Sequence, residues 1–338
     1  MGMLSGEVPR DKAYSVTVIV CTRGRPDLLE QCVEALFRQT YPDFDVLIVD
    51  NAAAAGTRGI CERWPVSWIH VPVPGLTRAR NAGVRAARGD LVAFIDDDGL
   101  PEAGWLEAML EDFSDPRIAA VSGKVRYMKA LPGTRAMSEE ESIEDPPRER
   151  NRFDSTTQGW FALACFGGIG DGGNMMFRRS VLGSAIAFDE RLGRGRILEC
   201  ADEHVAFASL IAAGYRIAHN PASVVRHPAP STPEVRKARR LRDLRLSIAY
   251  VLFLWQEFAS HRGDIARFLA RAVAKRLRWN RAPRIGGVDL TRGEALRAMA
   301  GGLALFTRAR KEWSGDSARA REGGSVLPPV ARQVSELR

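Results

Sequence analysis

The chain has 338 residues, of which 45% are hydrophobic and 27% charged, as is typical of a globular protein with one large domain and an appendage. Its five cysteines are dispersed without a CxxC pair, which argues against a disulfide framework or a zinc cluster and predicts a cytoplasmic protein. Residues 1–14 contain no apolar segment of the secretory type, so we expect a flexible N-terminus and no signal peptide.

The first hundred residues alternate between predicted strands and helices. Apolar runs at 15–21 and 45–49 predict buried strands, and 68–71 is a weaker third one. Helices are predicted after Asp27 and at 76–89. This order predicts a mainly parallel sheet with its strand ends at one edge. No GxGxxG opens the first helix and no GxxxxGK precedes Ser or Thr, which argues against dinucleotide-binding and P-loop proteins.

The strand predicted at 91–95 leads directly into Asp96, Asp97 and Asp98. Ligands of open α/β sheets bind beyond such strand ends. Because side chains alternate along a strand, Asp96 and Asp98 point to one side and Asp97 to the other. Two oxygen ligands on one side predict Mg²⁺ or Mn²⁺ together with substrate phosphates. The alternative, capping of the next helix, explains one Asp better than three adjacent ones.

The middle of the chain contains a strand predicted at 118–125 and two unusual segments. Residues 137–157 are charged, contain prolines and lack apolar periodicity, which predicts a mobile loop that is either a lid or a simple surface loop. Residues 167–174 contain five glycines, which favours close approach of a ligand to the backbone, with a flexible turn as the alternative.

A second acidic site opens the helix predicted after Cys200. The helix dipole favours carboxylates in a first turn, so capping alone can explain Asp202, and catalysis by Glu203 stays open. A later strand ends at His227, which is either a structural histidine or a metal ligand.

The C-terminal third is strongly basic. From residue 234 onward it contains 23 Lys/Arg and 10 Asp/Glu, a net charge of +13. Two helices with apolar and basic stripes predict either an anionic membrane surface bound through 234–281 or packing against the rest of the protein. Their apolar cores are too short to span a bilayer. Nucleic-acid binding is not expected, because aromatic residues are not interleaved with the arginines.

Taken together, the motifs resemble family 2 inverting glycosyltransferases with the GT-A fold, over about residues 15–230. The resemblance depends on the order and spacing of short segments, each of which is weak alone. These segments are Val20–Arg23, Ile48–Asn51, Gly75–Gly83, Gly89–Asp90 with Phe94–Asp98, Phe188–Glu190, Asp202–Glu203 and Ala213–Ile217.

The resemblance implies roles for individual residues. Thr22 and Asp50 would hold the nucleobase, and Asp98 would bind the cation together with Asp96 and His227. Glu203 would be the catalytic base, with Asp202 as the fallback, because the family's usual order of these two acids is reversed here. The remaining nucleotide-binding assignments are Arg25, Arg78, Arg80, Asn81, Asp96 and Asp97, and the acceptor-binding assignments are Trp160, Gly173 and Asn174.

The predicted fold is α/β, with a GT-A domain and a helical C-terminal extension. The predicted activity is a Mn²⁺- or Mg²⁺-dependent transfer of sugar from a UDP- or dTDP-sugar to a lipid-linked, polysaccharide or small-molecule acceptor in cell-envelope glycan synthesis. The alternatives are a sugar-phosphate nucleotidyltransferase and a non-catalytic lipid- or nucleic-acid-binding protein. The expected segments are 1–14, a catalytic domain at 15–232 with a nucleotide-binding half (15–128) and an acceptor half (129–232), a basic helical region at 233–313 and a disordered tail at 314–338.

Overall fold

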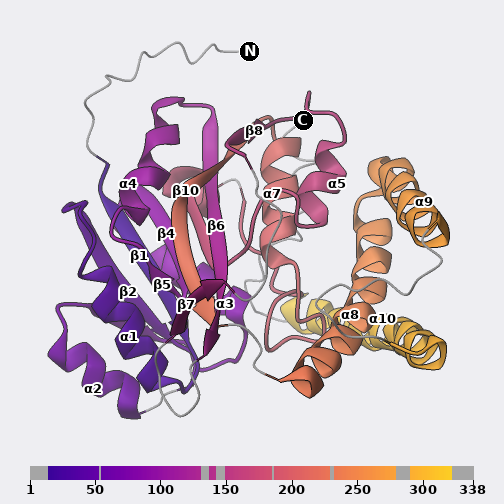
Figure 1. The fold of residues 1–338 in the computed structure, drawn as a ribbon, viewed down its shortest axis with the longest axis horizontal. Helices are drawn as coiled ribbons and strands as arrows, with labels where there is room; N and C mark the ends of the chain where they lie inside the picture. Colours follow the sequence, from indigo (N-terminus) through magenta and orange to yellow (C-terminus); the bar gives the residue numbers. More distant parts are fainter. Residues whose placement is uncertain are drawn as a thin grey trace.

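The computed structural model describes residues 14–52, 55–130, 137–141, 149–184, 186–228, 232–278 and 290–321. A central sheet lies between two layers of helices, and three further helices form the C-terminal region beside it (Figure 1). The first half contains β1 (Val16–Thr22), α1 (Pro26–Leu36), β2 (Phe44–Asp50), α2 (Ala55–Arg63), β3 (Ser67–His70), α3 (Leu76–Ala86), β4 (Leu91–Asp96), β5 (Leu100–Pro101), α4 (Trp105–Leu110), η1 (Glu111–Ser114) and β6 (Ile118–Ala130). The second half contains β7 (Met137–Glu141), β8 (Asn151–Phe153), α5 (Trp160–Cys165), β9 (Asn174–Arg178), α6 (Arg179–Ser184), α7 (Asp202–Ala212), β10 (Arg216–Pro228), α8 (Pro233–Glu257), η2 (Ala259–His261), α9 (Arg262–Arg278) and α10 (Arg292–Arg321).

The sheet follows the order β3-β2-β1-β4-β9-β6-β10-β5. Strands β1 to β4 pair in parallel with one another, as the alternation of strands and helices predicts. Strand β9 then runs antiparallel between β4 and β6. The register pairs Thr22 with Asp50 and Cys21 with Asp96, so the polar ends of β1, β2 and β4 lie side by side.

Both faces of the sheet are covered, which explains the continuous apolar runs in β1, β2 and β4. On β1, Ile19 packs with the cluster that includes Phe94 and Phe207, whereas Val18 and Val20 pack with the cluster on the opposite face. Phe94 meets Phe188 edge to face at a centroid distance of 5.3 Å. These contacts fix β4, and with it the position of the acids at its end.

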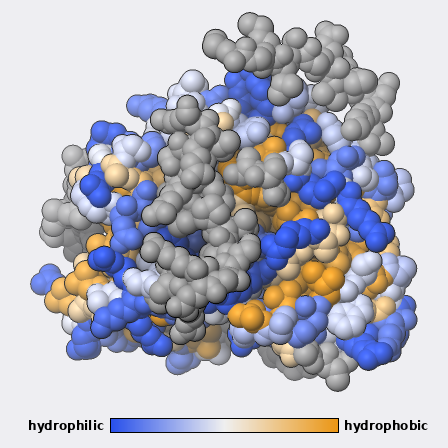
Figure 2. Space-filling view, turned by 180° about the vertical axis from the view of Figure 1, so that it is seen from behind, coloured by the Kyte–Doolittle hydropathy of each residue, from blue (hydrophilic) through white to orange (hydrophobic). Residues whose placement is uncertain are grey.

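The C-terminal helices share a hydrophobic core with the sheet and its flanking helices, so they are not a separate amphipathic unit. Phe253 of α8, Ile265 of α9 and Ala309 of α10 are all fully buried. Phe161 of α5 stacks on His261 with a centroid distance of 4.2 Å. Packing was one of the two alternatives for this region, and the described helices follow it. None of the described helices has the length and apolar character needed to cross a bilayer. On the rear face of the molecule, hydrophobic side chains gather in several patches among hydrophilic ones (Figure 2).

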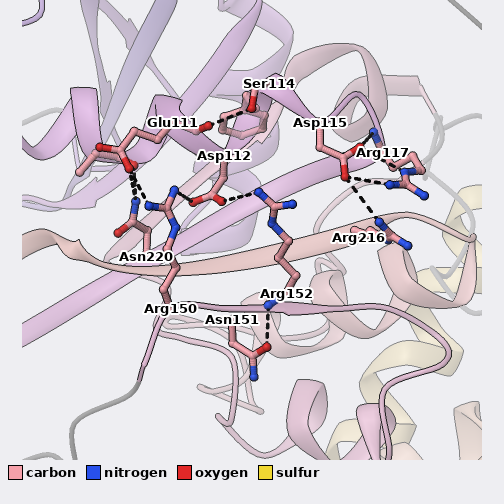
Figure 3. Close-up of polar contacts among 12 residues, drawn as sticks. Glu111, Asp112, Ser114, Asp115, Arg117, Arg150, Asn151, Arg152, Arg216 and Asn220 are labelled. Atoms are coloured by element: carbon pink, nitrogen blue, oxygen red, sulfur yellow. Dashed lines mark hydrogen bonds and ion pairs between the residues drawn. The ribbon is translucent and has the colours of Figure 1, made fainter.

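The charged segment 137–157 is more ordered than predicted. It contains β7, which pairs with β6, and β8, which pairs with β10; residues 142–148 lie outside the described residues. Charged contacts explain why apolar periodicity was uninformative: Arg150 and Arg152 both form ion pairs with the buried Asp112 (Figure 3). The sequence prediction of a mobile loop is therefore wrong for these two strands.

The expected tail also begins later than predicted, because α10 continues to Arg321. Its side chains pack as far as Trp313, which meets Phe253 at 5.7 Å between ring centroids. The expectations for 1–13 and for 322–338 lie outside the described residues.

Candidate active site

A cavity of about 790 Å³ lies at the carboxyl edge of the sheet. Thr22 and Asp96 reach it from β1 and β4, and Asn51 reaches it from the end of β2. A smaller cavity of about 160 Å³ adjoins it and shares the wall that contains Asp96. The sequence therefore located the correct edge of the sheet.

Asp96, Asp98 and His227 form a group suited to a divalent cation. One ligand atom from each lies within 4.8 Å of the others. His227 Nδ1 lies 3.0 Å from the carbonyl oxygen of Pro228, which favours a proton on Nδ1 and directs the Nε2 lone pair toward the acids. Asp98 Oδ1 is buried without a hydrogen-bond partner and lies 3.0 Å from this Nε2. Two facing lone pairs need a cation or a proton between them, so these residues fit the metal role.

The electrostatics of this group agree with that assignment. Burial opposes ionisation of Asp98, but the neighbouring His227 and Arg25 outweigh it and hold the pKa of this carboxyl well below its usual range. Burial lowers the pKa of His227, and the adjacent Asp98 and Asp96 reverse this and raise it. In the absence of a metal, a proton on His227 therefore takes the place of the cation.

Asp97 follows the end of β4 and lines neither of the two cavities. It is fully buried, accepts a hydrogen bond from Thr22 Oγ1 at 2.7 Å and forms an ion pair with Arg25. Arg25 also lies 2.7 Å from Asp98 and lines the larger cavity. These contacts hold the loop after β1 and give no support to the assignment of Asp97 to the nucleotide.

Asp50 is buried, and its Oδ1 accepts a hydrogen bond from the backbone N–H of Ala52 at 2.9 Å. Its neighbour Asn51 lines the cavity instead. The Asn51 amide donates to the carbonyl oxygens of Val71 and Val73, at 2.7 and 2.9 Å. The sequence analysis missed Asn51, although its place directly after a buried strand was a usable signal.

Arg78 and Asn81 also lie outside the cavity. Arg78 forms an ion pair with Glu190 at 3.2 Å, and the Asn81 amide forms hydrogen bonds of 2.9 and 3.0 Å with the backbone of Phe188. Both side chains hold the segment after α6 against α3. Because these contacts lie on the packed face of α3, they give no support to the assignment of either residue to the nucleotide.

Arg80 is buried and lies between the two acidic sites. It forms an ion pair with Asp202, donates to the carbonyl oxygen of Gly172 at 2.8 Å and lies 3.9 Å from Asp96. Its guanidinium lies 5.6 Å from the ring centroid of Phe188. Arg80 lines the smaller cavity, where it neutralises Asp202.

Glu203 also lines the smaller cavity, with Asp171, Gly172 and His227. Burial and the negative charge of Asp202 raise the pKa of Glu203 well above its usual range, although Arg80 opposes the shift. A carboxyl with a raised pKa is a stronger base when it is deprotonated. Both acids line the smaller cavity, but their partners differ. Asp202 forms an ion pair with the buried Arg80, whereas the nearest basic nitrogen to Glu203 among the described residues is His204 Nε2, 3.6 Å from its Oε1.

The three acceptor assignments have different outcomes. Gly173 lines the smaller cavity, and a Cβ at this position would lie 2.9 Å from Asp96 Oδ2. Asn174 is fully buried, where it accepts from Trp105 Nε1 at 2.8 Å and donates to the backbone. Trp160 packs against His261 at a centroid distance of 5.1 Å. Asn174 and Trp160 line neither of the two cavities, so their packing contacts give no support to these two acceptor assignments.

The sequence analysis also missed residues from the second half of the chain. Arg194 and Glu199 precede α7 and line both cavities, as does Arg239 of α8. Arg242 of α8 lines the larger cavity. The basic composition of 233–313 was noticed, but it gave no signal that these arginines face the sheet edge.

The fold is that of GT-A glycosyltransferases, as comparison with solved structures shows. Staphylococcus aureus TarS 1–349 in complex with UDP-GlcNAc has a TM-score of 0.53 at 17% identity, covering 87% of this chain and 81% of that one. The mannosyltransferase PcManGT from Pyrobaculum calidifontis, in complex with GDP-Man and Mn²⁺, has a TM-score of 0.50 at 20% identity, covering 97% and 86%.

Residues 17–184 match the model described as "Glycosyl transferase family 2", and through this segment the chain belongs to that family. Glycosyltransferase AglE of Haloferax volcanii is 30% identical over 129 residues, which are 36% of this chain and 42% of AglE. The pre-mycofactocin glycosyltransferase of Mycobacterium tuberculosis is 27% identical over 229 residues, 66% of this chain and 44% of the relative. The succinoglycan biosynthesis protein ExoM of Rhizobium meliloti is 30% identical over 125 residues, 34% and 40%. The chain thus spans less than half the length of each of these relatives.

Proposed function

We propose that the chain is an inverting glycosyltransferase that moves a sugar from a nucleotide-diphosphate donor to a hydroxyl group of an acceptor. The observation that carries this proposal is the contact between the two cavities. Asp96 belongs to both, so a cation bound by Asp96, Asp98 and His227 is adjacent to the cavity that contains Glu203. A leaving diphosphate and a base on opposite sides of one carbon atom are what inversion requires.

In the proposed reaction, Glu203 accepts the proton of the acceptor hydroxyl. The acceptor oxygen forms a bond to the anomeric carbon while the bond from that carbon to the diphosphate oxygen breaks, and a nucleoside diphosphate leaves. A Mn²⁺ or Mg²⁺ ion supplies positive charge for the leaving diphosphate when it is bound. Arg80 holds the Asp202 carboxylate in an ion pair, so that Glu203 is the carboxyl available to the acceptor.

The donor is proposed to be a UDP- or dTDP-sugar, and GDP-sugars join the test because PcManGT is described with GDP-Man. The acceptor is proposed to be a polysaccharide, a lipid-linked glycan or a small molecule of cell-envelope synthesis. The names of ExoM and of the pre-mycofactocin glycosyltransferase support a polysaccharide and a small molecule, respectively.

The test uses the purified full chain with Mn²⁺ and a panel of UDP-, dTDP- and GDP-sugars, and it measures release of nucleoside diphosphate with and without acceptors. At least one donor is expected to be cleaved, and Asp98→Ala is expected to abolish this. Glu107→Ala, an exposed acid in α4, is the matched control and keeps full activity. Full activity of Asp98→Ala contradicts the proposal. Release of pyrophosphate from a sugar phosphate and a nucleoside triphosphate also contradicts it, because that product identifies a nucleotidyltransferase.

Presentation of the acceptor at an anionic membrane surface, bound through residues 234–281, is part of the proposal. Its support is the exposure of Trp255 and Leu269, at 42% and 37%, within a basic region. Co-sedimentation with vesicles of anionic and of neutral lipid tests it, and Trp255→Ala combined with Leu269→Ala is expected to weaken binding to the anionic vesicles. Membrane binding of this kind is contradicted if equal amounts of the protein sediment with anionic and with neutral vesicles, or if the protein binds RNA alone.

A further inference from the structure

Several arginines lie where the two cavities meet, in addition to the metal-binding group of Asp96, Asp98 and His227. Arg194 and Arg239 line both cavities, and Arg242 lines the larger one. Arg23 and Arg25 also reach the larger cavity, whose acidic residues are Asp96 and Glu199. An arginine-rich cavity of this kind favours an anionic ligand, and guanidinium groups bind phosphate oxygens in pairs.

Helix packing determines where Arg239 and Arg242 point. Residues 239, 242, 246, 249 and 253 are spaced by three or four and therefore lie on one face of α8. The last three are Leu246, Ala249 and Phe253, all buried against the catalytic body. The two arginines extend the same face to the cavity, where their side chains are 43% and 49% exposed. Both arginines pair with the exposed Asp243, at 3.8 Å from Arg239 and 3.4 Å from Arg242, and their exposure leaves them accessible to solvent and to a ligand.

The loop that contains Arg194 is tied to the same helices. Arg191 lies 2.9 Å from Glu257 of α8, and Arg196 lies 2.8 Å from Glu312 of α10. The carbonyl oxygen of Arg194 accepts a hydrogen bond of 2.9 Å from the N–H of Leu76 at the start of α3. The loop and α8 therefore bring their arginines to one place.

We propose that Arg194, Arg239 and Arg242 form a diphosphate-binding subsite, an inference that rests on the proposed function. The bond broken in the transfer must be reached from the nucleotide side and from Glu203, so the leaving diphosphate lies where the two cavities meet. The C-terminal helices thereby complete the active site. The same chemistry is offered by two sources, the diphosphate of the nucleotide donor and the diphosphate of a lipid-linked acceptor.

The test is titration calorimetry on the full chain in Mn²⁺, with UDP and GDP for the donor source, geranyl diphosphate for the acceptor source and uridine as a probe without charge. The Arg239→Gln/Arg242→Gln double variant is expected to bind at least one diphosphate roughly tenfold more weakly, with uridine binding and thermal stability unchanged. The diphosphate whose affinity falls in this variant identifies the source. Arg194→Gln should act in the same direction, and Arg239→Lys/Arg242→Lys should recover part of the affinity. Arg236→Gln, on α8 but outside the described cavity lining, is the matched control.

Affinities within twofold of the unaltered chain for UDP, GDP and geranyl diphosphate overturn the subsite. An equal loss in Arg236→Gln also overturns it, because the effect is then one of general charge. Arginine-dependent diphosphate binding without transfer from any donor supports the subsite while refuting the proposed function, so the two failures are distinguishable.

Discussion

Arg80 and Asp202 form a buried ion pair at the floor of the smaller cavity, with side chains that are 4% and 5% exposed. The pair withdraws Asp202 from any role as a base, because its carboxylate is held by a guanidinium. Under the proposed function the adjacent Glu203 is then the base, although the order of these two acids is the reverse of the one that the family resemblance implies.

Replacing Glu203 by Gln tests this assignment of different roles to Asp202 and Glu203. Turnover is expected to fall by roughly 10²- to 10⁴-fold, the range for loss of a general base, because the amide cannot accept the acceptor proton. Binding of UDP or GDP should change little, since the amide keeps the shape of the cavity. Steady-state kinetics and calorimetry measure the two effects, with Glu107→Gln as control. If Glu203→Gln keeps more than about a tenth of the turnover, another residue is the base.

The rate should depend on pH through the same carboxyl. Burial and Asp202 raise the pKa of Glu203 to about 8, and the base acts only when deprotonated, so turnover is expected to rise with pH up to that value. The contribution of Glu203 to folding stability changes with pH in the opposite direction to the rate. Because the folded state binds this proton more tightly than the unfolded chain, the stability it contributes is greatest below the unfolded pKa and is lost as pH rises through about 8. A pH–rate profile that is flat from about pH 6 to about pH 9 contradicts the assignment.

Asp202→Asn should affect stability first. The substitution leaves Arg80 buried without its partner, which costs roughly 3–5 kcal/mol of unfolding free energy. Urea denaturation measures this loss. Glu62→Gln breaks the exposed pair with Arg58 and should change stability by less than about 1 kcal/mol. Equal effects of the two substitutions refute a buried structural role for Asp202.

Asn174→Ala separates a structural from an acceptor-binding role. Its amide joins Trp105 Nε1 to the carbonyl oxygens of Lys124 and Ser223, so removal leaves buried polar groups unpaired. A loss of at least about 2 kcal/mol is expected, with little change in the KM for acceptor at temperatures where the variant is folded. A raised KM without loss of stability restores the acceptor assignment.

Gly173→Ala should weaken activity without unfolding the protein. The new methyl group would lie 2.9 Å from Asp96 Oδ2, and the half-exposed Asp96 can rotate away from it, out of its place among the metal-binding side chains. The dependence of activity on Mn²⁺ concentration is expected to shift to higher concentrations. Gly104→Ala is the control, because its nearest neighbour, Glu107 Oε2, is 4.0 Å away. An unchanged Mn²⁺ dependence contradicts this effect.

Much of the sheet edge could be predicted because local rules determine it. Continuous apolar runs identified β1, β2 and β4. Asp96 and Asp98 share one group with His227, as expected, although Asp97 and Asp98 follow the end of β4 and both pair with Arg25. The contacts of Asp97 with Thr22 and Arg25 join segments about 72–75 residues apart, and local rules do not indicate them.

The remaining errors arise from contacts between residues distant in the sequence. Asn174 was assigned to the acceptor because it follows a glycine-rich segment, but it hydrogen-bonds Trp105, 69 residues away in the chain, and is buried. Strands β7 and β8 form on partners that their own sequences do not indicate. Likewise, arginines that suggested a lipid surface face a cavity, because buried residues further along α8 determine the rotation of the helix.

The ion pairs Arg191–Glu257 and Arg196–Glu312 have a practical consequence for protein engineering. A polypeptide cut at the boundary near residue 232 would lose the anchors of the loop that precedes α7, together with the part of the larger cavity's wall that α8 supplies. Exchanging the C-terminal helices between related proteins would accordingly transplant that part of the wall, and under the proposed diphosphate subsite such chimeras should differ in ligand preference.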